Sequence, residues 1–434
     1  MKISVVGCGY LGAVHAAAMA QLGHEVVGVD VDADKVEHLA AGKPPFYEPG
    51  LADVLTSAGA TGRLRFSTDV ADVAGAAVHF LAVGTPQSTT GLGADLSHVD
   101  AAVDGLLPHL RPGDLVAGKS TVPVGTAADL GGRVRATGAL LAWNPEFLRE
   151  GHAVDDTIRP DRLVYGADPA EADDVVRLLD EVYADAIAAG TPRLVTNLAT
   201  AELVKTAANA FLATKISFIN AMAEIAEVAG ADVTQLADAL GHDARIGRRF
   251  LDAGVGFGGG CLPKDIRAFT ARAEELGRGE SLRFLTEVDA INLRRRERVV
   301  DMAVDALGGS VFGKKVAVLG VTFKPESDDV RDSPALDVAV RLKGLGAEVV
   351  ATDPQGIDNA TARHPQLLYT RQTDEALRHA DLVVLVTEWR EYRELDPDAV
   401  GQLARGRTII DGRNVLDRDA WRAAGWRYVG MGRP

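Results

Sequence analysis

The sequence predicts an α/β fold in which two doubly wound domains are joined by a central helical region. Three observations support this prediction. Short apolar runs alternate with helical stretches over residues 1–196, no strand pattern is apparent over residues 197–307, and the alternation resumes over residues 308–434. Such alternation is typical of mostly parallel sheets that are covered by helices on both faces.

Seven apolar segments are predicted to form the strands of the first domain. They are KISVV (2–6), HEVVGVD (24–30), LRFS (64–67), AAVHFLAVG (76–84), DLVAGKS (114–120), ALLAWN (139–144) and DRLVYG (161–166). Many of them are apolar throughout, which is typical of strands that are buried in a parallel sheet.

A glycine-rich turn after the first strand predicts that this domain binds a dinucleotide. Gly7, Gly9 and Gly12 lie between that strand and a helical stretch, and the next strand ends at Asp30. In such a Rossmann-like arrangement the glycines admit the pyrophosphate, and the acidic residue binds the ribose hydroxyls. Because the carboxylate of Asp30 repels a ribose phosphate, NAD is favoured over NADP. The alternative is a glycine turn without a function.

Two further residues lie near this turn. Lys35 either helps to hold the adenosine side of the cofactor or is a solvated lysine on a helix. Cys8 lies inside the turn and is interpreted as a small packing residue.

The helical region, from Ala199 to about Leu307, is interrupted by the loop GFGGGCLPKD (256–265), which carries Cys261. One interpretation is a glycine-rich turn with an inert, buried cysteine. In the other, the glycines let backbone N–H groups approach a ligand, and Lys264 favours the thiolate. A thiolate beside NAD is suited to aldehyde oxidation, because it can add to the carbonyl and carry the resulting thioester until water releases the acid.

Four apolar segments predict the second, smaller α/β domain. They are KKVAVLGV (314–321), AEVVATDP (347–354), DLVVLVTEW (381–389) and RTIIDGR (407–413).

Composition argues against several classes of protein. A net charge of −15 over 434 residues argues against general nucleic-acid binding, which needs a basic surface. No apolar run approaches the length of a membrane span, and the N-terminal residues lack the uninterrupted apolar run of a signal peptide. Two cysteines far apart in sequence fit a reducing compartment, so a cytoplasmic location is expected. No metal site is predicted.

Seven motifs make the chain similar to the nucleotide-sugar 6-dehydrogenases of the UDP-glucose/GDP-mannose dehydrogenase family. They are STVPVGT (120–126), NPEFLREG (144–151), AELVKTAANAFLATKISFIN (201–220), ARIGRRFL (244–251), GVGFGGGCLPKD (254–265), FKPESDDVRDSP (323–334) and DGRNVLD (411–417). The resemblance implies oxidation of a sugar C6 alcohol to a carboxylate with two NAD. The cysteine loop most resembles the UDP-glucose branch, so UDP-glucose is the expected substrate. It does not resemble the GGHC-type loop of the UDP-N-acetylmannosamine branch.

The resemblance implies a role for each matching residue of the catalytic set. Cys261 is the nucleophile. Lys205 and Asn209 are four residues apart and share a helix face, where the lysine stabilises a developing alkoxide and the asparagine orients the hydroxyl. Asp265 positions a water together with the lysine. Without the resemblance, Lys205 would be interpreted as an exposed ion pair with Glu202.

Two carboxylates, Glu146 and Glu150, follow a strand end and are also four residues apart. One of them is expected to be the base that activates the hydrolytic water, and the sequence leaves both open. Thr121 resembles the residue that supports this water and contacts the cofactor. The alternative for Thr121 is a strand-end cap.

The residues and the resemblance together predict two sets of binding residues. The cofactor set is Gly7, Gly9, Tyr10, Leu11, Gly12, Asp30, Lys35, Thr85, Thr121, Glu150, Lys264 and Arg331. The substrate set is Glu146, Phe147, Leu148, Arg149, Glu150, Lys205, Asn209, Arg245, Phe250, Leu251, Asp252, Ala253, Gly254, Gly258, Lys324 and Arg413. Arg245 resembles an arginine that reaches into the neighbouring subunit's site, which implies a homodimer or a larger homo-oligomer.

Three positions depart from the family pattern. Gly260 stands where the family often has Ser, Ser327 where Thr is common, and Asp252 where some relatives carry a basic residue. The departure at Asp252 bears on how the phosphates are bound and leaves the catalytic set intact.

The resemblance assigns a role to each part of the chain. Residues 1–196 are expected to bind NAD, 197–307 to form a helical dimerisation region with the catalytic loop, and 308–434 to bind the nucleotide sugar. Two other functions remain compatible. A GDP-mannose 6-dehydrogenase uses the same catalytic set with a purine. A non-catalytic, NAD-responsive protein with a redox-sensing Cys261 requires loss of part of that set, which is complete here.

Overall fold

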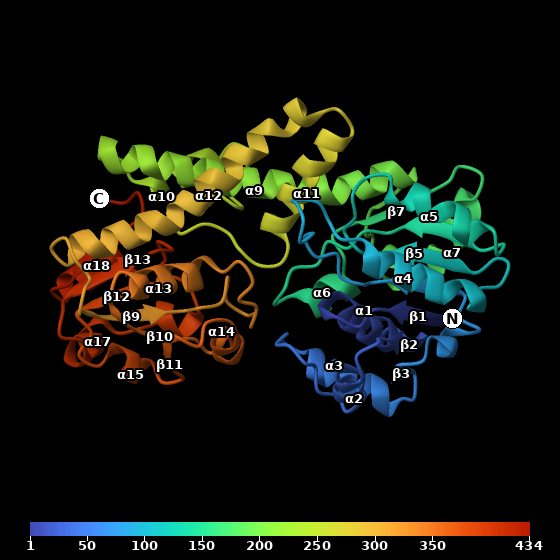
Figure 1. The fold of residues 1–434 in the computed structure, drawn as a ribbon, viewed down its shortest axis with the longest axis horizontal. Coiled ribbons are helices and arrows are strands. Elements are labelled where there is room, and N and C mark those ends of the chain that lie inside the picture. Colours follow the sequence, from blue (N-terminus) through green and yellow to red (C-terminus); the bar gives the residue numbers. More distant parts are fainter. The chain divides into compact units, whose positions relative to one another are not determined.

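The computed structural model describes residues 1–434, and the chain divides into two compact units (Figure 1). The first unit comprises residues 1–208 and 271–279, and the second comprises residues 209–270 and 280–434. Each unit contains one sheet, and the chain between the two sheets is helical. The predicted fold class is therefore confirmed, whereas the division into three domains stays a prediction. None of the helices has both the length and the apolar character needed to span a bilayer.

The first unit is built on an eight-stranded sheet. Its strands are β1 (Lys2–Val6), β2 (Glu25–Val29), β3 (Leu64–Ser67), β4 (Val78–Leu81), β5 (Leu115–Gly118), β6 (Leu140–Trp143), β7 (Leu163–Ala167) and β8 (Arg193–Thr196). Their order is β3-β2-β1-β4-β5-β6-β7-β8. All neighbours are parallel except β6 and β7. The chain order reverses between β1 and β4, and ligands of open α/β sheets bind at such a switch point.

Helices cover both faces of this sheet. They are α1 (Tyr10–Gln21), α2 (Ala33–Ala40), α3 (Leu51–Ala60), α4 (Ser97–Leu106), α5 (Thr126–Arg135), α6 (Ala153–Ile158), α7 (Ala172–Val182) and α8 (Ala184–Ala188), with the short 3-10 helices η1 (Val70–Val73) and η2 (Leu107–His109). One core joins α1, α3 and α7 to the sheet, and another joins α4 and α5 to it. Phe80 and Leu81, which are successive residues of β4, point into different cores, because side chains alternate between the faces of a sheet.

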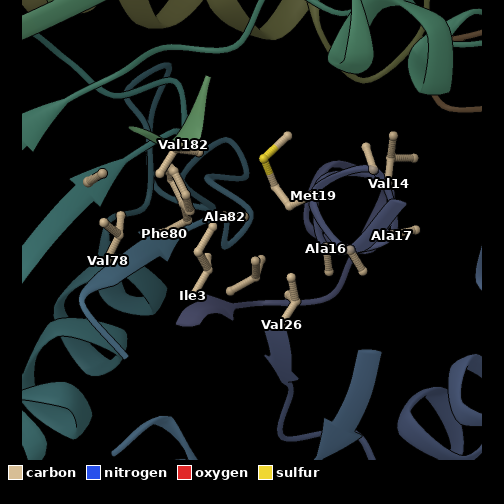
Figure 2. Packing of buried hydrophobic residues seen from close by; sticks show 14 of the residues in the cluster. Ile3, Val14, Ala16, Ala17, Met19, Val26, Val78, Phe80, Ala82 and Val182 are labelled. Carbon is tan, nitrogen blue, oxygen red and sulfur yellow. The ribbon is translucent and has the colours of Figure 1, made fainter. Parts of the chain in front are cut away.

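Helix α1 lies directly on the sheet because its side chains are small. Residues 12–20 are all buried, and most of them are alanine or glycine. Figure 2 shows Met19 on the side of α1 that faces Phe80 of β4, and both belong to the same core. This close packing fixes the N-terminus of α1 beside the end of β1.

The second unit contains a six-stranded sheet in the order β11-β10-β9-β12-β13-β14, and all of its neighbours are parallel. Its strands are β9 (Lys315–Leu319), β10 (Glu348–Thr352), β11 (Leu368–Thr370), β12 (Leu382–Leu385), β13 (Thr408–Asp411) and β14 (Arg427–Gly430). Its helices are α13 (Pro334–Gly344), α14 (Ile357–Arg363), α15 (Thr373–Leu377), α16 (Arg390–Arg393), α17 (Pro397–Leu403) and α18 (Arg418–Ala423).

Four helices lie between the two sheets in the sequence. They are α9 (Leu198–Ala229), α10 (Val233–Gly241), α11 (Leu262–Glu275) and α12 (Gly279–Ala306). No strand interrupts this stretch, as the sequence predicts. The glycine-rich loop lies between α10 and α11.

Three strands and one strand direction differ from the sequence prediction. Strands β8, β11 and β14 were not expected, because β8 is an edge strand with mostly exposed side chains, β11 has only three residues, and β14 begins with an exposed arginine. None of these segments therefore presents a continuous apolar run. The antiparallel direction of β7 is not predictable from its composition, because an apolar segment carries no direction.

Candidate active site

The glycine turn lies between β1 and α1, at the switch point of the first sheet. A Cβ on Gly12 would collide with the carbonyl oxygen of Gly7, so only glycine allows the first turn of α1 to approach so closely. A Cβ on Gly9 would meet no heavy atom within 4 Å, so the N-terminus of α1 is open there. Open N–H groups at a helix N-terminus bind phosphate. The turn therefore fits the pyrophosphate of a dinucleotide.

Asp30 follows β2 and connects this turn to the second strand. Its Oδ2 accepts a hydrogen bond from the N–H of Cys8 at 2.7 Å. The Nζ of Lys35 lies 3.0 Å from Oδ1 and 3.1 Å from Oδ2. The structure thus pairs two residues that the sequence predicts on the adenosine side of the cofactor. Burial raises the pKa of the Cys8 thiol, so Cys8 is an inert packing residue.

Glu48, which the sequence analysis missed, connects the glycine turn with the segment NPEFLREG. Its carboxylate accepts hydrogen bonds from the Tyr10 hydroxyl and from the N–H groups of Gly151 and Ala153, the last two at 2.7 Å. Leu11 packs against the core beneath the turn. Glu48 gives no local signal in the sequence, because Gly151 lies 103 residues away.

The two predicted carboxylates of this segment have different surroundings. Glu146 Oε1 accepts hydrogen bonds from the N–H groups of Phe147, at 2.8 Å, and Leu148, at 3.1 Å. Glu146 Oε2 lies 3.1 Å from the Nζ of Lys119. Burial raises the pKa of the Tyr10 hydroxyl, and the charges of Glu48 and, to a smaller extent, Glu150 raise it further.

The loop with Thr121 is held from two sides within the first unit. The Thr85 hydroxyl donates a hydrogen bond to the carbonyl oxygen of Thr121 at 2.8 Å. Buried Glu202 of α9 accepts hydrogen bonds from the N–H groups of Gly125, at 2.7 Å, and Ala127, at 2.6 Å, at the start of α5. Burial raises the pKa of Glu202, and these hydrogen bonds oppose that shift. Glu202 is therefore held at the start of α5, and the alternative of an ion pair with Lys205 is wrong.

Lys205 approaches the segment that carries Glu146. Its Nζ lies 5.5 Å from the centroid of the Phe147 ring, and the guanidinium of Arg162 lies 3.8 Å from the same centroid. Both distances fit cation–π contacts. Arg149, by contrast, is exposed and forms an ion pair with Asp156 at 2.7 Å.

Cys261 is exposed and immediately precedes α11, in the second unit. Its carbonyl oxygen accepts a hydrogen bond from the N–H of Asp265 at 2.9 Å, so Cys261 is at the N-terminal end of the helix. A helix N-terminus stabilises a thiolate. The buried alternative for this cysteine is therefore wrong.

Three predicted residues meet one turn beyond Cys261. The Nδ2 of Asn209 in α9 donates a hydrogen bond to Asp265 Oδ2 at 2.6 Å. The Nζ of Lys264 lies 2.7 Å from Asp265 Oδ1. Asn209 and Asp265 are both buried, so their relative orientation is fixed.

Asn292 of α12, which the sequence analysis also missed, fixes the glycine loop. Its Oδ1 accepts a hydrogen bond from the N–H of Phe257 at 2.7 Å, and its Nδ2 donates one to the carbonyl oxygen of Phe257 at 3.0 Å. A Cβ on Gly256 would collide with this Oδ1, so the loop needs glycine here. Asn292 lies 35 residues from Phe257 and is fully buried in a helix, so periodicity along the chain does not reveal this contact.

Arg413 joins three segments of the second unit. Its guanidinium donates hydrogen bonds to the carbonyl oxygens of Val386, at 2.8 Å, and of Gly256 and Phe323, both at 3.0 Å. The residue that is predicted to bind the nucleotide thus also holds the backbone of the cysteine loop.

The other predicted ligands of the second unit have local partners. Arg245 forms an ion pair with Asp243 at 2.6 Å, and Asp252 forms one with Arg248 at 2.9 Å. Arg331 lies 2.7 Å from Asp329.

The remaining predicted positions shape the backbone near these side chains. Leu251, Ala253, Gly254 and Gly258 are buried, Phe250 has a φ of 65°, and Lys324 Nζ lies 5.5 Å from the Phe323 ring centroid. The guanidinium of Arg331 occupies the space beside Gly260, where a Cβ would collide with it.

Sequence comparison finds one family over most of the chain. The family is described as the UDP-glucose/GDP-mannose dehydrogenase family, and its NAD binding, central and UDP binding domains match residues 1–187, 199–294 and 317–418. The UDP-glucose 6-dehydrogenase of Rhizobium meliloti (strain 1021) is 41% identical over 439 residues, covering 100% of each chain. The predicted NAD cofactor is thereby confirmed.

Solved structures show the same similarity. A UDP-glucose dehydrogenase from the hyperthermophilic archaeon Pyrobaculum islandicum is 38% identical with a TM-score of 0.90, covering 100% of this chain and 98% of that one. A GDP-mannose dehydrogenase from Pseudomonas aeruginosa is 28% identical with a TM-score of 0.53, covering 99% of this chain and 100% of that one.

Two helical glycines of the first unit allow a matched test of the dinucleotide turn. Gly12→Ala places a Cβ against the carbonyl oxygen of Gly7, and we expect it to weaken NAD binding at least about tenfold. Gly132→Ala in α5 places its Cβ in open space, so it should leave NAD affinity unchanged and stabilise the protein by about 0.5–1 kcal/mol. Titration calorimetry with NAD and thermal melting measure both effects. Equal NAD affinity in the two variants would contradict the proposed cofactor site.

Proposed function

Because the chain belongs to the UDP-glucose/GDP-mannose dehydrogenase family, we propose that it oxidises UDP-glucose to UDP-glucuronate in two NAD-dependent steps. The observation that carries this proposal is the exposed Cys261 at the N-terminus of α11, one turn from the fixed pair of Asn209 and Asp265. An exposed thiol beside an oriented carboxylate supports covalent oxidation of an aldehyde.

The first oxidation depends on groups that stabilise a developing alkoxide. Bound NAD supplies the hydride acceptor for both oxidations. The C6 hydroxyl of the sugar gives up its proton through water to Asp265, whose carboxylate is held by Asn209 at 2.6 Å and by Lys264 at 2.7 Å. Lys205 stabilises the negative charge that develops on the oxygen.

The second oxidation takes place on Cys261. The thiolate adds to the C6 aldehyde and forms a thiohemiacetal, which retains the sugar on the protein. Loss of a hydride from C6 and of the hydroxyl proton converts this adduct into a thioester. Water then attacks the thioester carbon, the C–S bond breaks, and the electron pair leaves with the sulfur of Cys261.

Glu146 is the carboxylate that we assign to this hydrolysis. Its oxygens are fixed by two backbone N–H groups and by Lys119. A fixed carboxylate can orient the water and accept its proton.

The similar proteins include enzymes of several nucleotide sugars, and the sequence identities favour UDP-glucose. The UDP-glucose 6-dehydrogenase of Rhizobium meliloti (strain 1021) is 41% identical, compared with 25% for a UDP-D-ManNAc dehydrogenase from Pyrococcus horikoshii and 28% for the GDP-mannose enzyme. GDP-mannose is accordingly the competing substrate to be tested.

A stripe of exposed apolar side chains on α9 supports assembly into a dimer. Phe211, Phe218 and Ile225 are spaced by seven residues and have exposed fractions of 66%, 48% and 60%, and Val228 continues the stripe. Side chains at this spacing share one helix face, and a continuous exposed apolar face marks an interface. We infer that a second copy covers this stripe and that Arg245 of each copy completes the site of its partner.

The stoichiometry of the reaction tests the proposed chemistry. We expect two NADH for each UDP-glucuronate and no free aldehyde, because the aldehyde is retained on Cys261. NADH is followed by its absorbance with a panel of UDP- and GDP-sugars, and the products are separated by chromatography. One NADH per turnover with released aldehyde, or turnover of GDP-mannose alone, contradicts the proposal.

The role of Cys261 is tested by two substitutions. Cys261→Ala should lower the rate of acid formation by at least about three orders of magnitude, while melting and NAD binding stay close to those of the wild type. Cys261→Ser should form an ester that hydrolyses slowly, so intact mass should show the chain heavier by one sugar nucleotide. Ser281→Ala, an exposed residue of α12, is the control. If Cys261→Ala forms the acid at close to the wild-type rate, Cys261 is not the nucleophile and its role is structural.

Shared sites predict a specific pattern of complementation between inactive subunits. Mixed dimers of Cys261→Ala and Arg245→Ala chains should regain activity, because one of their two sites receives an intact cysteine and an intact arginine. Mixed dimers of Cys261→Ala and Asp265→Asn chains, whose residues lie one helical turn apart in the same chain, should not. Refolded or co-expressed mixtures are assayed for NADH formation. If the mixture of Cys261→Ala and Arg245→Ala chains gains no activity, Arg245 does not complete the active site of the partner subunit.

A further inference from the structure

Lys119 is a buried cation that has entered the proposed chemistry only through its contact with Glu146. It follows the last residue of β5 and precedes the segment with Thr121, and its side chain is only 3% exposed. A buried ammonium is costly unless charged or polar groups surround it. Its partners therefore indicate why it is there.

The three N–H groups of Lys119 have three nearby acceptors. Its Nζ lies 3.1 Å from Asn144 Oδ1, 3.1 Å from the Tyr183 hydroxyl and 3.1 Å from Glu146 Oε2. The Tyr183 hydroxyl in turn donates to Asn144 Oδ1 at 2.7 Å. The pKa of His15 is lowered by burial and then by the charge of Lys119, so the His15 imidazole is neutral. Glu146 is therefore the charged partner of Lys119.

The carboxylate of Glu146 is consequently fixed at three of its four acceptor positions. Oε1 accepts the N–H groups of Phe147 and Leu148, and Oε2 accepts from Lys119. A carboxylate has about four lone-pair sites, so one site on Oε2 is left for a further donor. The side chain of Glu146 is partly exposed, so a water molecule can reach it.

We propose that Lys119 is a positioning residue that fixes the Glu146 carboxylate for hydrolysis of the thioester, an inference that rests on the proposed function. When water attacks the thioester carbon, one of its protons goes to the remaining site on Glu146 Oε2. The C–S bond breaks, and the thiolate of Cys261 takes the proton of the new carboxyl group. No electrons leave the substrate in this step, so it needs no oxidant.

This role makes a step-specific prediction. The first hydride transfer depends on Lys205 and Asp265 and the second takes place on Cys261, whereas Glu146 acts only on the hydrolytic water. Without Lys119 the carboxylate keeps its two N–H contacts at Oε1 but loses the contact that orients Oε2. Hydrolysis should therefore slow while both oxidations continue.

Lys119→Met, which keeps the length of the side chain and removes its charge, tests this inference. Rapid mixing with UDP-glucose and NAD should show a burst of two NADH per chain, followed by a steady state at least about tenfold slower than that of the wild type. Intact mass taken after the burst should show the chain carrying the thioester. The control is Tyr183→Phe, which removes another partner of Lys119 and keeps the ion pair, and it should show wild-type steady-state turnover.

A second comparison separates positioning from a general effect on the fold. In a Glu146→Gln background, adding Lys119→Met should cause no further slowing of hydrolysis, because the group through which it acts is already gone. The doubly substituted chain contains no unpaired buried charge, so this comparison remains decisive if Lys119→Met alone does not fold. Further slowing in the double variant, or equal loss of burst and steady state in the single one, overturns the inference. A wild type that forms fewer than two NADH for each UDP-glucuronate instead overturns the proposed function.

Discussion

The loops that carry the functional residues depend on buried polar side chains that hydrogen-bond to their backbone. Asp30 accepts the N–H of Cys8 in the dinucleotide turn, Glu202 accepts two N–H groups before and within the first turn of α5, and Asn292 pairs with both backbone groups of Phe257. A buried backbone group without a partner costs about 1–3 kcal/mol, and short loops have no helix or sheet partners to supply one. These side chains therefore make the conformations of the loops compatible with burial.

The same side chains link the loops to regular elements that carry other functional residues. Glu202 lies three residues before Lys205 on α9, so the helix that carries the predicted catalytic lysine also holds the start of α5. Glu48 holds both Tyr10 of the glycine turn and Gly151 beside Glu150. A displacement at one of these links is thus transmitted to more than one part of the proposed chemistry.

The two cysteines show how position determines the chemistry of one residue type. Both lie in glycine-rich turns that directly precede a helix. Cys8 is buried, and burial raises the pKa of its thiol, so it remains protonated and unreactive. Cys261 is exposed at the N-terminal end of α11, where the helix favours a thiolate. Only the second is available to a substrate.

The sequence by itself determined the fold class and the dinucleotide turn, because apolar runs and glycine spacing are local signals. The proposed catalytic groups followed from its resemblance to a known family, since four-residue separations alone do not identify them. It did not reveal β8, β11 or β14, whose segments lack a continuous apolar run. Only the tertiary structure decided which groups hold the site in place. Lys119 and Glu146 follow the neighbouring strands β5 and β6 and form an ion pair. Glu48 accepts a hydrogen bond from Gly151, which lies 103 residues away in the sequence. Such pairs arise from the packing of separate elements, and no period along the chain encodes them.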